Sequence, residues 1–218
     1  MRVLVTGAAR GIGRALVQAL VARGDHVVAT VRREGELAPG PRLEVLVMDV
    51  ADEASVQAAR ARCAGPLDLL FSNAGLSGGP QRAPGMDLAR AANIVDVNAL
   101  GALRVYDAFV DLLREAKAPW LVQFSSEAAS LGAFRASSKP EYAMSKAALN
   151  ALTRWIAATE PHVRVVSLHP GWTRTAMGGE GAPRSTAETA EAVLRAVDRL
   201  GPEQNGAFVD TDLAPIPW

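Results

Sequence analysis

The sequence lacks the residues on which several classes of protein depend. Its single cysteine, Cys63, allows no internal disulfide and no cysteine-rich metal site. The three histidines are scattered and offer no metal-ligand spacing, so we expect no metal ion. Lysine and arginine together number 23, as do aspartate and glutamate, and no basic block favours binding to nucleic acid.

Long apolar runs and targeting signals are also missing. No run approaches the roughly 20 apolar residues that cross a bilayer. A strand pattern begins at the first residues, with no charged leader or apolar signal segment before it. We therefore expect a cytoplasmic protein without a membrane partner. A chain of 218 residues that is 49% hydrophobic and 21% charged is typical of one soluble domain, which we expect to span residues 1–218.

Apolar runs that predict strands alternate with helical patterns along the whole chain. The strands are continuous apolar runs, as expected when helices cover both faces of a parallel sheet. This alternation predicts a doubly wound α/β domain with a mostly parallel, seven-stranded sheet, a Rossmann fold. The expected strands are 3–6, 26–31, 43–48, 67–72, 120–124, 163–168 and 207–209. The expected helices begin near 12, 52, 87, 141 and 186, and the one over 87–116 has a possible interruption at Asn98.

Polar residues stand at the ends of these predicted strands. In an open α/β sheet the ligand binds beyond the carboxyl ends of the strands. Side chains that converge on this edge predict a cofactor cleft. The residues concerned are Thr6, Asp49, Asn73, Ser125, Ser126 and His169.

A glycine-rich turn follows the first strand and opens the first helix. Gly7, Gly11, Ile12 and Gly13 form this turn. A helix N-terminus with small residues admits a phosphate closely, which predicts a dinucleotide site. A tight strand–helix turn without a ligand would need glycine as well, so the turn alone leaves both interpretations open.

The end of the second strand indicates which nucleotide would bind. A site for NAD usually has Asp or Glu there to hold the ribose 2′-hydroxyl. At this strand end the chain reads Ala29-Thr30-Val31-Arg32-Arg33, with no acid until Glu34. Arg32 or Arg33, together with Arg10, could instead pair with a 2′-phosphate, unless all three are solvated surface residues. The missing acid and the arginines together favour NADP(H) over NAD(H).

Two further segments are candidates for the cofactor site. Asp49, with Val50 beside it, could accept a hydrogen bond from adenine, or could cap the next helix in competition with Asp52. The small residues of Asn73-Ala74-Gly75 could let the backbone approach a ribose, or could form an ordinary turn.

Tyr142 and Lys146 are the strongest candidates for catalysis. Their i, i+4 spacing places the phenol and the ammonium on one face of a helix. There the cation would favour phenolate and lower the pKa of Tyr142, which could then exchange a proton with a carbonyl or alcohol. Ser125 or Ser126 could hydrogen-bond the substrate, or could cap the backbone. His169 could act as a base, although a histidine before Pro-Gly is more typical of a packed turn.

These residues, in this order, resemble the short-chain dehydrogenase/reductase family over nearly the whole chain. The similar segments are Thr6-Gly7-x-x-x-Gly11-x-Gly13, Asn73-Ala74-Gly75, Val97-Asn98-Ala99, Ser126, Tyr142-x-x-x-Lys146, and Pro170-Gly171 with Thr173 and Thr175. Within the family, the segment 171–177, which includes Trp172, and the terminal Ile216-Pro217-Trp218 are similar to the C-factor and sniffer-like carbonyl reductases.

The resemblance implies a role for each catalytic residue. Tyr142 would protonate a carbonyl oxygen, and Lys146 would lower the pKa of Tyr142 and bond the nicotinamide ribose. Ser126 would orient the carbonyl, and Asn98 would hold a water that links Lys146 to solvent. The interval from Ser126 to Tyr142 is longer than the commonest family spacing, which leaves Ser125 and Ser130 as alternatives. The segment 170–175 would cradle nicotinamide.

The residues that could meet a substrate are mostly apolar: Leu131, Gly132, Phe134, Trp172 and Met177. They favour small to medium aldehydes, ketones or quinones. The short, glycine-rich segment between Thr175 and Thr186 predicts an open or mobile cleft, unless its glycines merely form a loop. A homodimer through the helices 87–116 and 141–158 is possible. Apolar residues there could serve core or interface: Val105, Phe109, Leu113, Leu152 and Trp155.

The alternatives to an NADPH-dependent reductase are an NADP(H)-binding sensor and an NAD-dependent alcohol dehydrogenase.

Overall fold

A seven-stranded parallel sheet forms the centre of the computed structural model, which describes residues 1–80, 84–133 and 139–218. The strand order is β3-β2-β1-β4-β5-β6-β7, and every described pair is parallel. The doubly wound fold predicted from the sequence is therefore confirmed. The strands are β1 (Arg2–Val5), β2 (His26–Val31), β3 (Leu43–Val47), β4 (Leu69–Ser72), β5 (Trp120–Phe124), β6 (Arg164–Leu168) and β7 (Phe208–Val209).

Helices connect successive strands except β2 and β3, which a segment without a helix joins. The helices are α1 (Gly11–Arg23), α2 (Glu53–Arg62), α3 (Leu88–Val95), α4 (Gly101–Arg114), α5 (Pro140–Thr159) and α6 (Thr186–Val197). A π-helical turn, η1 (Asp96–Leu100), joins α3 to α4, so the long predicted helix changes its hydrogen bonding around Asn98. Such turns are frequent at functional sites.

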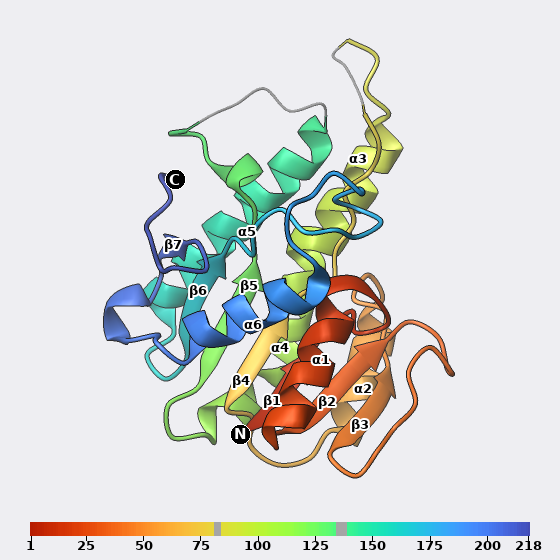
Figure 1. The fold of residues 1–218 in the computed structure, drawn as a ribbon, viewed down its shortest axis with the longest axis vertical. Helices are drawn as coiled ribbons and strands as arrows, with labels where there is room; N and C mark the ends of the chain where they lie inside the picture. The colour runs from red at the N-terminus through yellow and green to blue at the C-terminus, as the bar shows by residue number, and fades with distance from the viewer. Residues whose placement is uncertain (81–83, 134–138) are drawn as a thin grey trace.

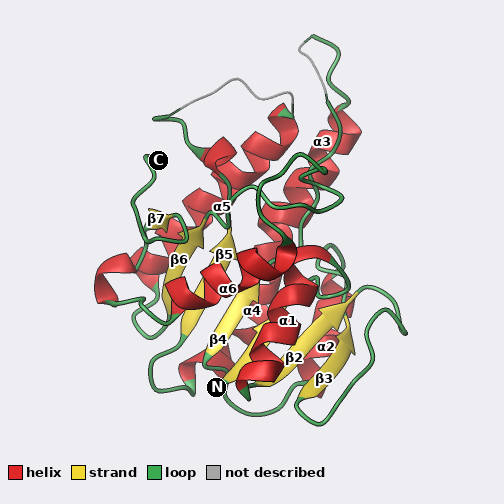
Figure 2. Ribbon diagram, in the orientation of Figure 1, coloured by secondary structure: helices red, strands yellow, loops and turns green. Residues whose placement is uncertain are grey.

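Helices cover both faces of the sheet (Figures 1 and 2). Val3 and Val5 of β1 pack in the core cluster that includes α1 and α6, whereas Leu4 packs in the cluster that includes α2, α4 and α5. Successive side chains of a strand point to opposite faces, so both need apolar residues. The first turns of α5, together with α3, extend beyond the carboxyl ends of the strands (Figure 1).

Of the five apolar residues predicted to lie either in the core or at a dimer interface, most lie in the core and one is exposed. Val105, Phe109 and Leu113 of α4 are buried in the core, and Leu152 packs partly buried against it. Trp155 of α5 is 56% exposed. A homodimer through these helices stays a prediction, for which Trp155 provides apolar surface.

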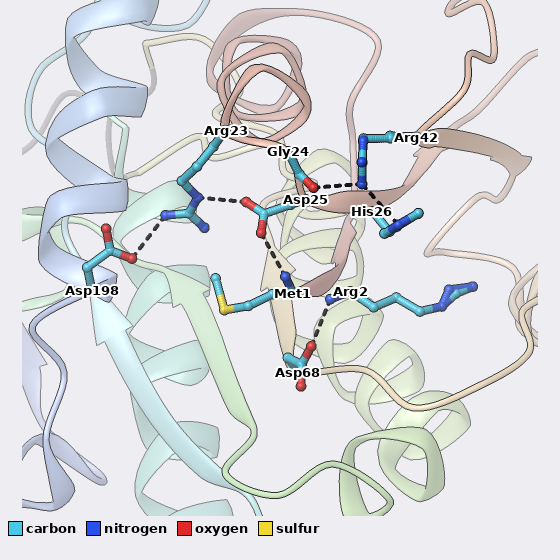
Figure 3. Close-up of polar contacts among 9 residues, drawn as sticks. All are labelled: Met1, Arg2, Arg23, Gly24, Asp25, His26, Arg42, Asp68 and Asp198. Atoms are coloured by element: carbon cyan, nitrogen blue, oxygen red, sulfur yellow. Dashed lines mark hydrogen bonds and ion pairs between the residues drawn. The ribbon is translucent and has the colours of Figure 1, made fainter.

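A polar network joins the elements at the opposite edge of the sheet, where the strands begin (Figure 3). The buried carboxylate of Asp25 accepts hydrogen bonds from the amino group of Met1, at 2.9 Å, and from Arg23, at 2.6 Å. Arg23 also bonds Asp198, beyond the end of α6. Burial would raise the pKa of Asp25, but these bonds and charges hold it below its usual value. The network fixes α1 and α6 together, far from the candidate site.

Two negative findings concern the described part of the chain. None of its helices combines the length and the apolar character that a membrane crossing needs. Its His, Cys, Asp and Glu side chains form no group of three or more that could hold a metal ion.

Candidate active site

The adjacent ends of β1 and β4 are held together where the strand order reverses direction. The hydroxyl of Thr6 accepts hydrogen bonds from the backbone N–H groups of Asn73 and Ala74, both at 3.0 Å. The side-chain amide of Asn73 donates to the carbonyls of Thr6 and Gly7, at 2.8 and 3.2 Å. Thr6 and Asn73 therefore fix the walls of the crevice in which such folds bind ligands.

The glycine turn fits closely against the end of β4. A Cβ on Gly7, whose φ is +68°, would lie 2.9 Å from the Cα of Ala74. A Cβ on Gly13 would lie 2.5 Å from the amide nitrogen of Asn73. Arg10 is the N-cap of α1, and its side chain makes no capping hydrogen bond. The first N–H groups of α1 are therefore not bonded to the side chain of their own N-cap residue. This arrangement fits a phosphate.

Arg10 and Arg32 provide positive charge beside this turn. Both side chains are exposed, and neither has a hydrogen bond or ion pair with another described residue. Guanidinium groups without internal partners are suited to bind a phosphate group. The residues present therefore fit a dinucleotide that carries a 2′-phosphate.

The segment after β3 shows which acid caps the next helix. Asp52 is the N-cap of α2 and accepts hydrogen bonds from two N–H groups of its first turn. Asp49 accepts a hydrogen bond from the N–H of Ala51, at 3.0 Å, and does not cap α2. Val50 is buried against α4, where a Cβ on Gly101 would lie 2.9 Å from it. Asp49 and Val50 stay predicted cofactor residues.

Ser126, Tyr142 and Lys146 come together near the carboxyl ends of β5 and β6. Tyr142 and Lys146 occupy the first turns of α5, and the Nζ of Lys146 lies 5.8 Å from the centre of the Tyr142 ring. Ser126 follows β5, and its hydroxyl accepts a hydrogen bond from the N–H of Ala128, at 3.2 Å, so it caps the backbone. The same side chain is close enough to the phenol of Tyr142 to lower the pKa of that group. The spacing argument for one helix face agrees with this geometry.

The two alternative serines have other partners. Ser125 is buried and donates to the side chain of Asn150, at 2.7 Å. Ser130 donates to the carbonyl of Pro217. Ser126 is thus the serine of the three whose hydroxyl meets Tyr142 in the structure.

The pKa of Tyr142 differs in direction from the sequence-based expectation. Burial raises it, and the hydrogen bond with Ser126 lowers it only in part. Lys146 is not among the causes of this shift; its ammonium group lies 5.8 Å from the ring centre and donates to the carbonyl of Phe124, at 2.6 Å. Burial in turn lowers the pKa of Lys146 to about 8. The expectation of a lowered Tyr142 pKa is therefore wrong for this state of the protein.

Asn98 lies in η1, and both N–H groups of its side-chain amide are hydrogen-bonded. Its amide nitrogen donates to the carbonyl of Leu76, at 2.7 Å, and to the hydroxyl of Ser145, at 2.8 Å. Its oxygen accepts from the N–H of Leu76, at 2.7 Å. Asn98 therefore ties the segment after β4 to α5. A water held by Asn98 stays a prediction, and it would use the remaining lone pair of this oxygen or the backbone carbonyl.

The segment 170–175 closes the crevice from the side of β6. Gly171 has a φ of +88°, and a Cβ there would lie 2.9 Å from the guanidinium of Arg184. Thr173 is buried and shares a hydrogen bond with Thr189, at 2.8 Å. Thr175 lies 3.5 Å from the position of a Cβ on Gly11, so it faces the glycine turn. Pro170 is buried before this turn.

Exposed apolar side chains occur in the segments predicted to meet a substrate. Leu131 is 73% exposed, Trp172 59% and Met177 40%. Phe134 lies outside the described residues. The glycine-rich segment has hydrogen bonds: the carbonyl of Gly178 accepts from the indole of Trp172, at 2.8 Å, and its N–H donates to the hydroxyl of Thr175. These bonds join Gly178 to Trp172 and Thr175, and an open or mobile cleft stays a prediction.

His169 and three residues that the sequence analysis did not single out complete the surroundings. His169 is half-buried, and burial lowers its pKa, which favours the neutral imidazole. Ser145 donates to the carbonyl of Tyr142, at 2.7 Å, and receives the bond from Asn98. Glu141 and Arg90 form an ion pair. The only sequence signal for Ser145 and Glu141 is their place within and beside Tyr142-x-x-x-Lys146.

A parallel sheet with a glycine turn at its crevice and a serine–tyrosine–lysine cluster opposite defines an oxidoreductase of the dinucleotide-binding class. A family model described as short chain dehydrogenase matches residues 1–186, and the chain belongs to this family. The predicted family is thereby confirmed.

Relatives and solved structures agree with this assignment. The chain is 38% identical over 159 residues to C-signal of Myxococcus xanthus, an alignment that covers 72% of this chain and 95% of that protein. It is 29% identical to the NADPH-bound carbonyl reductase from chicken fatty liver, with a TM-score of 0.91 and coverage of 100% and 98%. It is 26% identical to the carbonyl reductase Sniffer of D. melanogaster, with a TM-score of 0.92 and coverage of 100% and 99%.

Replacement of Lys146 by methionine should stabilise the protein near neutral pH. Below its folded pKa of about 8, Lys146 carries a buried charge that the unfolded chain accommodates in water. Stability of the native chain therefore rises with pH between that value and the ordinary lysine pKa of about 10.4. The buried charge costs the native protein on the order of 3 kcal/mol at pH 7. The net gain of the methionine variant is smaller, because the variant loses the hydrogen bond to the Phe124 carbonyl.

The Tm of Lys146→Met and of the unchanged protein, compared at about pH 7 and about pH 10, tests this linkage. The excess Tm of the variant should be larger at the lower pH. Lys117→Met, at an exposed lysine, is the control and should show no such dependence. An equal difference at both pH values would contradict the buried-charge explanation.

Proposed function

We propose that this protein is an NADPH-dependent reductase that converts a carbonyl group of an aldehyde, ketone or quinone to an alcohol. The observation that carries the proposal is the cluster of Ser126, Tyr142 and Lys146, in which Ser126 lowers the pKa of Tyr142 and the Nζ of Lys146 lies 5.8 Å from the centre of its ring. The two carbonyl reductases of known structure that share the fold support the substrate class.

The preference for NADP(H) rests on this chain's arginines and on its structural relatives. The chicken liver reductase contains NADPH, and a short-chain dehydrogenase/reductase from Burkholderia multivorans contains NADP. Arg10 and Arg32 would bind the 2′-phosphate, and the glycine turn with the N-terminus of α1 would bind the pyrophosphate. The segment 170–175 would hold the nicotinamide end. The cofactor, when bound, supplies the hydride for reduction and accepts it in the reverse reaction.

Tyr142 would act as the general acid in the reduction. Its raised pKa keeps the hydroxyl protonated near neutral pH, so the group can donate its proton to the substrate oxygen. Ser126 would donate a hydrogen bond to the same oxygen and orient it. Lys146 is mostly protonated at pH 7 with a pKa of about 8, and its charge would favour the phenolate that remains.

A signalling protein that binds NADP(H) is the second candidate. One observation favours it: the relative from Myxococcus xanthus bears the name C-signal. Nucleotide sensing does not need a serine and a lysine beside a buried tyrosine, so we place the reductase first. Measured turnover with any carbonyl substrate would separate the two.

Replacement of Tyr142 by phenylalanine should abolish most turnover and leave NADPH binding intact. Loss of general acid catalysis typically costs about 10²–10⁴-fold in rate. The measurement is NADPH oxidation with a panel of aldehydes, diketones and quinones, together with the NADPH Kd. Tyr106→Phe is the control, because Tyr106 is buried against Glu160 at the other end of α5. Full activity of Tyr142→Phe would refute the proposed role.

Removal of Arg10 or Arg32 should weaken the preference for NADPH. A charge-assisted bond to the 2′-phosphate contributes about 1.5–3 kcal/mol, so the NADPH KM of Arg32→Ala should rise about 10–100-fold. The KM for NADH should stay within about 2-fold, because NADH has no phosphate there. Arg62→Ala, at an exposed arginine at the end of α2, is the control. Parallel losses for both cofactors would exclude this explanation.

A further inference from the structure

Glu141 is a buried carboxylate directly before Tyr142 on the first turn of α5. Its exposed fraction is 0%. Neither of its carboxylate oxygens has a hydrogen-bond partner among the described residues. A carboxylate without hydrogen bonds is costly to bury, because water would solvate it in the unfolded chain. Such a residue calls for a functional explanation.

Arg90 of α3 is the cation that accompanies this carboxylate. Its Nη2 lies 3.4 Å from the Oε1 of Glu141, close enough for an ion pair but without hydrogen-bond geometry. The same nitrogen donates to the carbonyl of Gly79, at 3.4 Å. Gly78 is in direct contact as well, because a Cβ there would lie 2.5 Å from the Oε1 of Glu141. Arg90 and Glu141 thus join α3, the segment 75–80 and the start of α5.

The segment 75–80 is held at both ends to the helix that carries the catalytic residues. Asn98 binds both backbone groups of Leu76 and the hydroxyl of Ser145 on α5. Arg90 and Glu141 make the corresponding link at Gly78 and Gly79. The first of these links is next to the Lys146 turn, and the second is next to Tyr142. A shift of the α5 start would move the phenol relative to Ser126.

We propose that the Arg90–Glu141 ion pair is a positioning pair that fixes Tyr142 for catalysis. The inference rests on the proposed function, in which Tyr142 transfers the proton. The pair does not touch the reacting atoms. It acts by holding the first turn of α5 against α3 and the segment 75–80.

Buried ion pairs allow a positioning role to be separated from a folding role. Removal of one partner is strongly destabilising, because it leaves an unpaired buried charge. Replacement of both partners by apolar residues of similar volume often restores stability. A variant with both charges replaced would therefore regain its Tm but lose the link to Gly79. Its kcat then reports on positioning alone.

The other end of α5 offers a matched control. Glu160, the C-cap of α5, is also a buried carboxylate paired with an arginine, Arg114, at 2.6 Å. The hydroxyl of Tyr106 donates to the same carboxylate, at 3.3 Å. The protein has two tyrosines, and each one stands beside one of the two ion pairs. A protein labelled with ¹³C at the Cζ of its tyrosines should therefore give two signals, which Tyr106→Phe assigns.

The experiment compares Arg90→Leu, Arg90→Leu/Glu141→Leu and Arg114→Leu by Tm, steady-state kinetics and the tyrosine signals. Arg90→Leu should lower the Tm, shift the Tyr142 signal and reduce kcat by about 10–100-fold, since small displacements of a reacting group have effects of that size. Its KM for NADPH should stay within about 3-fold. The double variant should recover most of the Tm and keep the reduced kcat. Arg114→Leu should lower the Tm and shift the Tyr106 signal, with kcat unchanged.

Recovery of kcat together with Tm in the double variant would overturn the proposal, and so would an unmoved Tyr142 signal in both Arg90 variants. If Arg90→Leu does not fold, the double variant alone supplies both readouts. If the unchanged protein reduces no carbonyl compound, the proposed function fails. The tyrosine signals then still test whether the ion pair fixes Tyr142.

Discussion

The parallel pairing of β1 with β4 is the constraint on which the rest of the structure depends. The chain leaves these neighbouring strands in opposite directions, so a crevice opens between their connections. The Thr6 hydroxyl and the Asn73 amide bind the two strand ends together, and the glycines fit against this joint. The position of the glycine turn is thus determined by contacts between the two strand ends.

The buried side of helix α5 is polar where it passes the strand ends. Ser145, Lys146, Asn150 and Thr153 are all at most 5% exposed, and each bonds a polar partner. An apolar helix would pack at lower cost, since buried polar groups must find partners to repay their desolvation. The result is a row of hydrogen-bonded donors and acceptors on the helix that carries Tyr142. A proton donor must be held in position to act.

Periodicity and turn chemistry predicted the fold well, because they act locally. The bounds of β2 and β5 agree with the expected strands. Of the two acids considered as the cap of α2, Asp49 and Asp52, the cap is Asp52. The choice among Ser125, Ser126 and Ser130 could not be made from the sequence, since it depends on partners such as Asn150, which lies 25 residues from Ser125. The direction of the Tyr142 pKa was mispredicted because spacing does not show the burial that raises it.

The two ends of α5 show what separates a structural carboxylate from a functional one. At the far end, Glu160 accepts hydrogen bonds from Arg114, from Tyr106 and from the N–H of His162, and these hold its pKa low despite burial. At the active end, Glu141 is more deeply buried and has only a loosely oriented ion pair. Lys146, four residues beyond Tyr142, is likewise buried at a cost, with its pKa lowered to about 8. Buried charged groups with poor hydrogen bonding are expected at functional sites, where some stability is lost so that reacting groups are correctly placed. The concentration of two such residues within one and a half turns of Tyr142 is therefore an independent argument that this end of α5 is the catalytic end.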